Sequence, residues 1–321
     1  MLLVYRRFGG SNEPRLLDLE SKLRECSCSP VHLKTRLGNT ILGNAGWLRG
    51  QLQELGPKNL VIADPQLIGM PSVFGLVQCV SLIRMCKSRG IKIFLVLFDL
   101  HDPQGALFGF LLSRSGEKVL LTCSTPSEAN YYFQIPESVG PVLPLMFKSS
   151  RSSITRRRLR ERAVDVHLPR PSYEPRRTIV SSLQKELDRI SISYLTGGSF
   201  ASEVEFEESL SLTRIIVVTN SVVPEATGRW PLPRGPIRHL VSYNFEALRA
   251  GSLLISEKCD ALNAVLVEGV HYVSFSTILE AVEKISYFLS NLDAAEEIAK
   301  SGWKYFNTLT ADCTELHRLL D

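Results

Sequence analysis

The chain has 321 residues, of which 44% are hydrophobic and 8% aromatic, and its 37 lysines and arginines nearly balance its 33 aspartates and glutamates. This composition excludes a disordered chain, and a chain of 321 residues favours two domains over a single core. It also argues against a membrane-spanning protein, because Arg84, Lys87 and Arg89 close the longest apolar run short of the roughly 18 residues that a membrane helix needs.

The N-terminus and the cysteines both predict a cytoplasmic protein. Five apolar or aromatic residues come before Arg6 and Arg7, whereas a secretory signal has the opposite order and a longer apolar segment. The seven cysteines are odd in number and include no CxxC pair. Cys26 and Cys28 lie one residue apart with no histidine cluster near them, so we expect free thiols and no metal site.

In the first half of the chain, short runs rich in Val, Ile and Leu alternate with longer helical patterns. This alternation is typical of a parallel sheet with crossover helices. Leu76, Val80, Ile83 and Met85 mark one such helix, which Gly90 ends. The predicted strands are residues 2–6, 59–64, 91–99, 118–123 and 140–145. Because these runs are apolar on both faces, helices should cover both sides of the sheet.

Residues 149–162 are polar and nearly free of core residues, which predicts a linker between the domains 1–148 and 163–306. The stretch 151–177 contains nine arginines against three acidic residues, so the rest of the chain is slightly acidic. Such a run suits peripheral contact with anionic lipid headgroups. Nucleic-acid binding is the other interpretation, but the run RRRLRER lacks interleaved aromatic residues for base stacking, and we expect no nucleic-acid partner.

The second half repeats the alternation of strands and helices. The predicted strands are residues 163–168, 190–195, 214–220, 252–256 and 271–275. The helix after the last of these carries a stripe formed by Leu279, Val282, Ile285 and Leu289, and it begins with a capping box of Thr277 and Glu280. Asp293 and Glu296 repeat this start signal for the next helix. Each half is therefore predicted to be a doubly wound α/β domain, and residues 307–321 are expected to return toward the first domain.

Two such domains facing each other would form a cleft lined by the carboxyl ends of their strands, where a ligand is expected. In the second domain, Gly197 and Gly198 follow one predicted strand, and Thr219 and Asn220 end another. At these positions backbone groups could contact a nucleotide base or a ribose. The glycine pair is also explained by a simple turn.

The most specific segment is NFEALRAGSLLISEKCDALNAVLVEGVHYVSF, residues 244–275. It resembles the C-terminal domain of GT-B glycosyltransferases, in particular the branch of group 1 enzymes related to spore-maturation CgeB proteins. The resemblance extends from about residue 163 to 306 and is looser in the first half. The matching positions are Phe245, Glu246, Ala247, Gly251, Glu257, Gly269 and Phe275. The resemblance implies the GT-B fold, in which two Rossmann-like domains face each other across a cleft.

The residues around this segment suit a nucleoside-diphosphate sugar. Asn244, Phe245 and Glu246 are predicted to open a short helix whose free N–H groups and dipole attract diphosphate oxygens, and Gly251 is predicted to end it. Glu246 in the first turn can accept hydrogen bonds from two ribose hydroxyls, although an acid there also simply complements the helix dipole. His239, Tyr243 and Asn244 are candidates for contacts with the sugar.

The resemblance also assigns roles to arginines. Arg170 and Arg177 occupy places comparable to the pair that holds the donor diphosphate in the family, and guanidinium groups bind phosphate without a metal. A solvated arginine face is the alternative. Many relatives hold the donor sugar with a glutamate eight positions before the one matched by Glu246, but this chain has Arg238 there. The departure leaves the sugar and the stereochemistry open.

In the first domain, Gly10 lies in a glycine-containing loop that resembles the acceptor-side loop of GT-B enzymes. The turn FDLHDP follows the most apolar strand, and Asp99 or His101 there could take a proton from an acceptor hydroxyl. Asp102 before Pro103 is explained equally well as a turn former.

Together these features predict a glycosyltransferase that moves a sugar from a nucleoside-diphosphate sugar, such as a UDP-sugar, to a hydroxyl acceptor. The acceptor is a glycan, a lipid-linked glycan, a protein or a small molecule, and the resemblance implies a retaining reaction with neither a metal nor another cofactor. The alternative is a GT-B-fold protein that has lost activity and serves as a binding or scaffold protein, because a fold alone does not determine chemistry.

Overall fold

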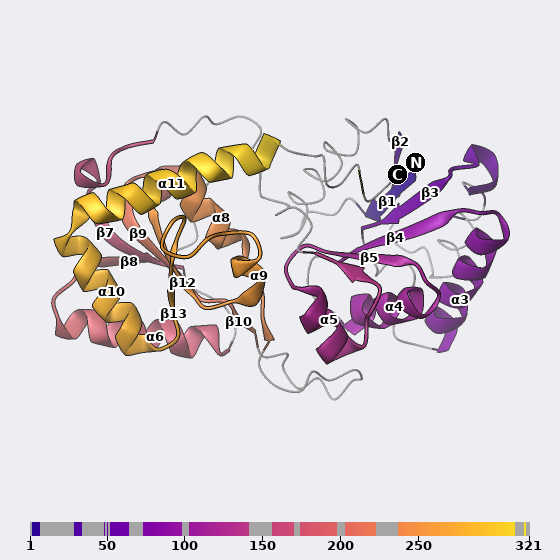
Figure 1. The fold of residues 1–321 in the computed structure, drawn as a ribbon, viewed down its shortest axis with the longest axis horizontal. Helices are drawn as coiled ribbons and strands as arrows, with labels where there is room; N and C mark the ends of the chain where they lie inside the picture. Colours follow the sequence, from indigo (N-terminus) through magenta and orange to yellow (C-terminus); the bar gives the residue numbers. More distant parts are fainter. Residues whose placement is uncertain are drawn as a thin grey trace. The chain divides into compact units, whose positions relative to one another are not determined.

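The structure is a computed structural model of the full chain. It describes residues 2–6, 29–33, 48, 50, 52–63, 73–97, 103–140, 156–169, 174–197, 203–222, 237–311 and 318. The chain divides into two compact units, one within residues 1–148 and one within 149–223 and 235–312, with residues 224–234 and 313–321 grouped with the first. Each unit is built around one parallel sheet (Figure 1).

The first unit contains a six-stranded sheet in the order β2-β1-β3-β4-β5-β6, and every neighbouring pair is parallel. Its strands are β1 Leu2–Arg6, β2 Ser29–Leu33, β3 Asn59–Ile62, β4 Lys92–Leu97, β5 Lys118–Leu121 and β6 Ser138–Val139. The four predictions that begin at residues 2, 59, 91 and 118 are therefore confirmed to within a few residues. The strand β2 was missed, because SPVHL is short and contains a proline.

Of the last strand predicted in this unit, 140–145, only Gly140 lies in the described residues, and it does not belong to a strand. The strand β6 comes earlier, and residues 141–145 lie outside the described residues. The helices of the unit are α3 Val73–Ser88, α4 Pro103–Arg114 and α5 Pro126–Phe133. Gly90 adopts the left-handed conformation, with φ of +67°, just after α3, as its role in ending the helix requires.

The second unit contains a five-stranded parallel sheet in the order β13-β12-β9-β7-β8 and a two-stranded antiparallel pair, β10 and β11. The strands are β7 Val164–Leu168, β8 Tyr194–Thr196, β9 Thr213–Val218, β10 Ser221–Val222, β11 Ile237–Arg238, β12 Leu253–Glu257 and β13 Val273–Phe275. The helices are α6 Arg176–Arg189, α7 Glu203–Ser211, α8 Ser242–Arg249, α9 Asp260–Asn263, α10 Ile278–Ser290 and α11 Leu292–Ala311, preceded by the 3-10 helix η2 Leu159–Glu161.

Both sheets have the same topology. In each of them the first strand lies between the second and the third, and the later strands follow in sequence order. This is a doubly wound arrangement, in which the chain turns back at the boundary between the first and third strands. In the second unit that boundary lies between β7 and β9, so the carboxyl ends of these two strands and of β12 form the expected ligand edge.

The core of the second unit lies between the sheet and the helices α6 and α10, while α8 covers the opposite face (Figure 1). The predicted apolar stripe of α10 is partly wrong, because Leu279 is 60% exposed and the buried residues are Ala281, Val282, Ile285 and Phe288. The predicted capping box is half formed. Thr277 accepts a hydrogen bond from the backbone of Glu280, but the Glu280 carboxylate accepts one from Ser276 instead of Thr277.

The strand predicted at 190–195 begins later, at Tyr194. The reason lies in the preceding helix: the N–H of Ile190 donates to the carbonyl of Leu187, which closes the last turn of α6, and Ser191 is left-handed with φ of 57°. These residues therefore complete a helix end and cannot pair in the sheet. Cys86, Cys123 and Cys259 are buried free thiols, as expected.

The linker predicted at 149–162 is wrong in its second part. Residues 156–162 belong to the second unit, because Leu159 is fully buried in the apolar core and its N–H donates to the Glu296 carboxylate of α11 at 2.8 Å. Arg156 pairs with the same carboxylate at 2.7 Å, and the side chain of Arg162 is buried. The basic run is therefore not a free surface as a whole, since two of its arginines are used inside the fold.

Candidate functional site

A buried polar network lies at the carboxyl ends of β9 and β12. These strands pair in parallel with Ser256 opposite Val218, so the residues that follow them lie side by side. The Glu257 carboxylate accepts hydrogen bonds from the backbone N–H groups of Asn220, at 2.9 Å, and Ser221, at 2.8 Å, and from the Ser221 hydroxyl. Glu257 thus fixes the turn between β9 and β10 to the end of β12.

Side-chain amides tie the start of α8 to this edge. The Asn220 amide donates to the Ser256 hydroxyl at 2.8 Å, and the Asn244 amide donates to the Asn220 side-chain oxygen at 2.9 Å. The Ser256 hydroxyl in turn donates to the Asn244 side-chain oxygen at 2.8 Å. The three side chains close a ring, and all of them are buried. Since satisfied buried polar networks specify position, this ring sets where α8 begins relative to the sheet.

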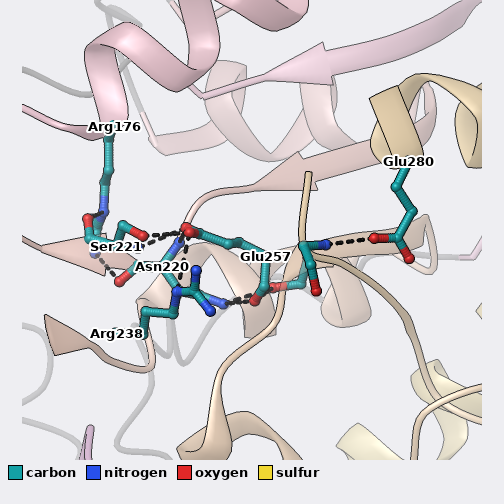
Figure 2. Close-up of polar contacts among 8 residues, drawn as sticks. Arg176, Asn220, Ser221, Arg238, Glu257 and Glu280 are labelled. Carbon is teal, nitrogen blue, oxygen red and sulfur yellow. Dashed lines mark hydrogen bonds and ion pairs between the residues drawn. The ribbon is translucent and has the colours of Figure 1, made fainter. Parts of the chain in front are cut away.

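Two arginines approach the same turn from different elements (Figure 2). Arg176, at the start of α6, is buried, and its Nε donates to the Ser221 carbonyl at 3.0 Å. Arg238, on β11, forms an ion pair from Nε to the Glu257 carboxylate at 3.3 Å, and its side chain is 42% exposed. The edge therefore combines a buried cation, a buried anion and one guanidinium that reaches solvent.

The helix α8 begins at Ser242 and not, as predicted, near Asn244. Its N-cap residue is Val241, whose backbone is extended and whose apolar side chain makes no capping hydrogen bond. The first N–H groups of a helix have no partner within the helix, and an uncapped start such as this one suits an anionic ligand. At the other end Gly251 has φ of +64°, which confirms its predicted role after the helix.

The earlier start of α8 places Glu246 two residues farther along the helix than predicted, beyond the first turn. Glu246 is buried, and its carboxylate pairs with Arg249 at 3.0 Å. Arg249 also pairs with Glu207 of α7 at 2.7 Å. Glu246 is therefore not a first-turn acid that complements the helix dipole, and its environment is an ion triad shared between α7 and α8.

Tyr243 lies in the first turn of α8 among aromatic neighbours. Its ring stacks on that of His167 with centroids 6.3 Å apart and meets the edge of Phe206 at 5.6 Å. Burial, with a smaller contribution from the Glu246 charge, raises the pKa of Tyr243 to about 12. His167, at the carboxyl end of β7, is fully buried, and burial lowers its pKa to about 4. Both side chains are therefore uncharged at neutral pH.

The other predicted site residues fall into three groups. Asn244, Asn220 and Thr219 lie at the carboxyl edge, and the first two belong to the polar network. Phe245 is 4% exposed and packs in the core, and Arg177 is exposed beside Glu174 at 3.6 Å. Five predicted site residues lie outside the described residues: Gly10, Asp99, His101, Arg170 and Gly198.

The sequence analysis predicted neither the central position of Glu257 nor the burial of Arg176, the neighbour of Arg177. Arg176 recurs with the buried residues Val180, Leu183 and Leu187 at helical spacing, so the apolar period of α6 already indicated which of the two arginines faces inward. Glu257 was named only as one of the positions that match the family resemblance, and no pattern in the residues themselves indicated its central position. Its role depends on the register between β9 and β12, which the sequence does not state.

Within the described residues, no cluster of three or more His, Cys, Asp or Glu side chains is arranged to hold a metal ion. None of the described helices combines the length and the apolar character needed to cross a membrane.

Comparison with known proteins gives a family match and a fold match. Residues 239–319 match a family model described as glycosyl transferase-like. No curated protein sequence matches this chain significantly. Among solved structures, a glycosyltransferase from Rickettsia africae is 12% identical, with a TM-score of 0.57, over 99% of this chain and 97% of that one.

Two other structures were solved with a nucleotide sugar. Anabaena HepE in complex with UDP-glucose is 11% identical, with a TM-score of 0.58, over 99% of this chain and 97% of that chain. T4 phage BGT in complex with its UDP-glucose substrate is 9% identical, with a TM-score of 0.55, over 100% of both chains. At these identities the likeness concerns the fold. The chain thus has the GT-B fold of two Rossmann-like domains, and the segment similar to glycosyl transferases begins at the buried network at the carboxyl edge of its second sheet.

Proposed function

We propose that this protein is a glycosyltransferase that takes its sugar from a UDP-sugar and transfers it to a hydroxyl acceptor. The observation that carries the proposal is the uncapped start of α8, fixed by buried amides at the carboxyl ends of β9 and β12, within the segment that matches the glycosyl transferase-like model. The choice of UDP rests on the UDP-glucose complexes of the two structural neighbours.

In this proposal the donor diphosphate lies at the start of α8. The positive end of the helix dipole and the N–H groups of Ser242 and Tyr243 would bind its oxygens, since the Asn244 N–H already donates to the Val241 carbonyl at 3.1 Å. Arg238, four residues before the helix and partly exposed, would add a guanidinium, and Arg170 and Arg177 remain the candidates taken from the family resemblance. Because a dipole and permanent cations can stabilise a leaving UDP, we propose a reaction that requires neither a metal nor another cofactor.

We assign the ribose hydroxyls to Glu246, since an ionised carboxylate accepts two hydrogen bonds from a vicinal diol. In the structure the Glu246 carboxylate is paired with Arg249, and this pair would hold it in place for the ribose. Thr219, Asn220 and Gly198 are proposed to lie near the nucleoside. Asn244 acts through the buried ring that fixes the helix, and Tyr243 borders the sugar side.

The first unit is proposed to bind the acceptor, with Gly10 near it and with Asp99 or His101 as the base. The same proposal includes four further points: retention of configuration, membership of the CgeB-related branch, a cytoplasmic location and peripheral contact with an anionic membrane. The acceptor is proposed to be a glycan, a lipid-linked glycan, a protein or a small molecule. In the run RRRLRER, the exposed arginines Arg157, Arg158 and Arg160 are the candidates for a membrane contact.

The test is the binding of UDP and the turnover of UDP-sugars by the purified protein. We expect UDP to bind in a calorimetric titration, and a panel of UDP-sugars to release UDP when an acceptor is present. Replacing Glu246 with Ala should weaken UDP binding by roughly tenfold or more, because a hydrogen bond to a charged group contributes about 1.5–3 kcal/mol. Replacing Glu283, an exposed glutamate of α10, with Ala is the matched control. Absence of UDP binding in the wild type would refute the proposal.

One observation favours a second candidate, a GT-B-fold protein that binds a nucleotide without transferring sugar. The carboxylates of Glu246 and Glu257 are both paired with arginines of the same unit. In that case UDP would bind, but no UDP-sugar would be consumed with any acceptor or with water. Measuring binding and turnover on the same preparation separates the two functions.

A further inference from the structure

The helices α7 and α8 are joined by a buried ion triad. The Arg249 guanidinium pairs with the Glu207 carboxylate at 2.7 Å and with the Glu246 carboxylate at 3.0 Å. The two acidic side chains are 6% exposed and the Arg249 side chain is 14% exposed. Two carboxylates thus share one guanidinium in a nearly dry environment.

Stability alone is a weak explanation for this arrangement. Removing charges from water costs several kcal/mol per ion, and buried ion groups are often no more stabilising than apolar residues of the same size. A cation in the last turn complements the dipole of α8, which accounts for Arg249, and an acid three residues earlier adds a pair within the helix. Neither reason accounts for Glu207, which comes from another helix and adds a second negative charge.

What the triad does is fix a carboxylate in space. Both carboxylates pair with the same nitrogen, Arg249 Nη2, so Glu207 holds in place the group that the Glu246 carboxylate contacts, and the rigid planar guanidinium limits how that nitrogen can move. The same two helices meet at a second place, where Phe206 of α7 contacts the Tyr243 ring in the first turn of α8. The helix α7 therefore packs on the first turn of α8 and, through Arg249, holds the side chain of Glu246.

We propose that Glu207 is a positioning residue for the donor ribose. It holds Arg249, and Arg249 holds the Glu246 carboxylate in the orientation that accepts the vicinal 2′- and 3′-hydroxyls. This inference rests on the proposed function, in which Glu246 binds the ribose. It goes further by assigning the discrimination between ribose and 2′-deoxyribose nucleotides to a contact between α7 and α8.

The test compares the affinities of the purified full chain for UDP and for 2′-deoxy-UDP by calorimetry. We expect the wild type to bind UDP roughly tenfold more tightly, since the deoxy nucleotide lacks one hydrogen bond to a charged acceptor. Glu207→Gln should bind UDP severalfold more weakly and leave the affinity for 2′-deoxy-UDP nearly unchanged, so that the preference falls toward one. Arg249→Met should give the same loss of preference and serves if Glu207→Gln does not fold.

The control is Arg189→Met. Arg189 is the last residue of α6 and pairs with Glu186 three residues earlier, as Arg249 pairs with Glu246 in α8, but it lies on the surface and has no third partner from another helix in the described part of the chain. This variant should keep the full preference for UDP. Thermal unfolding of each variant shows that the comparison is made on folded protein.

The outcomes separate the inference from the function on which it rests. If Glu246→Ala loses the preference while folded Glu207→Gln and Arg249→Met retain it, the positioning role is refuted and the proposed function stands. Equal weakening of both nucleotides in Glu207→Gln would also refute it, because that is the effect of a merely structural residue. A wild type that binds UDP without any preference refutes the ribose contact, and a wild type that binds no UDP refutes the function as well.

Discussion

The amino and carboxyl edges of the second sheet are each closed by a buried charged side chain, and the two charges are opposite. At the amino edge, Arg162 donates to the carbonyls of Thr213, Ala250 and Gly251, all of which lie at or just before the starts of β9 and β12. At the carboxyl edge, Glu257 accepts hydrogen bonds from the N–H groups that follow β9. The sign of each charge follows from the backbone groups that it meets.

The physical reason is the polarity of the connections. Helices end near the amino edge of a parallel sheet and present carbonyls there, whereas chains leaving the strands present N–H groups at the carboxyl edge. The two edges differ in whether a charged side chain there still reaches solvent. The hydrogen bonds of Arg162 go to carbonyl and hydroxyl oxygens inside the unit, and the side chain is 1% exposed. Glu257 is linked to Arg238, which reaches solvent. The amino edge therefore serves stability, and the carboxyl edge can also serve binding.

The largest effect on stability is expected from Arg162→Met. The variant leaves several buried carbonyls without donors, and at about 1–3 kcal/mol for each unsatisfied group we expect the free energy of unfolding to fall by roughly 3–4 kcal/mol. The affinity for UDP should stay within twofold of the wild type. Urea unfolding and calorimetry measure the two quantities. Arg160→Ala, which removes an exposed pair with Asp293, should cost less than about 1 kcal/mol. A UDP affinity that falls with Arg162→Met would contradict the separation of roles.

The second test uses pH, to which the edges should respond differently. Burial lowers the pKa of His167, at the carboxyl end of β7, to about 4, below its ordinary 6.5, and burial lowers the pKa of Arg162 to about 10. Between pH 6.5 and 4 the unfolded chain therefore binds a proton at His167 that the folded chain excludes. The full stability is present above pH 6.5 and is lost as the pH falls toward 4, by roughly 3 kcal/mol from this group.

His167→Phe should remove this part of the acid sensitivity, because the ring cannot titrate and still packs beside Tyr243. The measurement is urea unfolding of the wild type and the variant at several pH values between 7 and about 4.5. As the pH falls, the free energy of unfolding of the wild type should decrease relative to that of the variant. Parallel curves for the two proteins would mean that His167 is not excluded from protonation in the fold.

The third test is Glu257→Gln, which should destabilise the fold less than Arg162→Met does. An amide cannot replace a carboxylate that accepts from two backbone N–H groups and a hydroxyl without loss, so we expect a cost of about 2 kcal/mol, within the range of hydrogen bonds to charged groups. UDP affinity should fall at the same time, because the turn after β9 and Arg238 lose their anchor. Arg238→Ala is the companion variant. It should weaken UDP binding with less than about 1 kcal/mol of destabilisation, since the pair is partly exposed. Unchanged UDP affinity in both would place the donor elsewhere.

Much of the fold is local in origin and was predictable for that reason. Runs of buried Val, Ile and Leu predicted most of the strands of both sheets, and Gly90 and Gly251 were predicted to follow helices because a left-handed residue there favours glycine. The errors are also local. The strand β2 lacks a strong apolar run, and residues 190–193 resemble a strand in composition but complete the end of α6.

The candidate site was predictable only in part. The FEAL segment and the glycine after it identified the right helix, and Asn220 was named as the end of a strand. The start of α8 was placed two residues too late, so Glu246 was assigned to the first turn when it belongs to a triad with Glu207. The basic stretch was interpreted as a linker, although Arg162 lies in the interior of the second unit.

Local sequence patterns were enough to predict the alternation of strands and helices, the two parallel sheets and the helix that carries the candidate site, because these features depend on residues close together in the chain. Which charged side chains are buried, and which groups they contact, is established only in the folded chain. Glu257 meets Asn220 across 37 positions and Arg162 meets Ser252 across 90, and such contacts exist only once the register of the strands is set. Charges of this kind are stable in the interior only with partners that the fold brings to them.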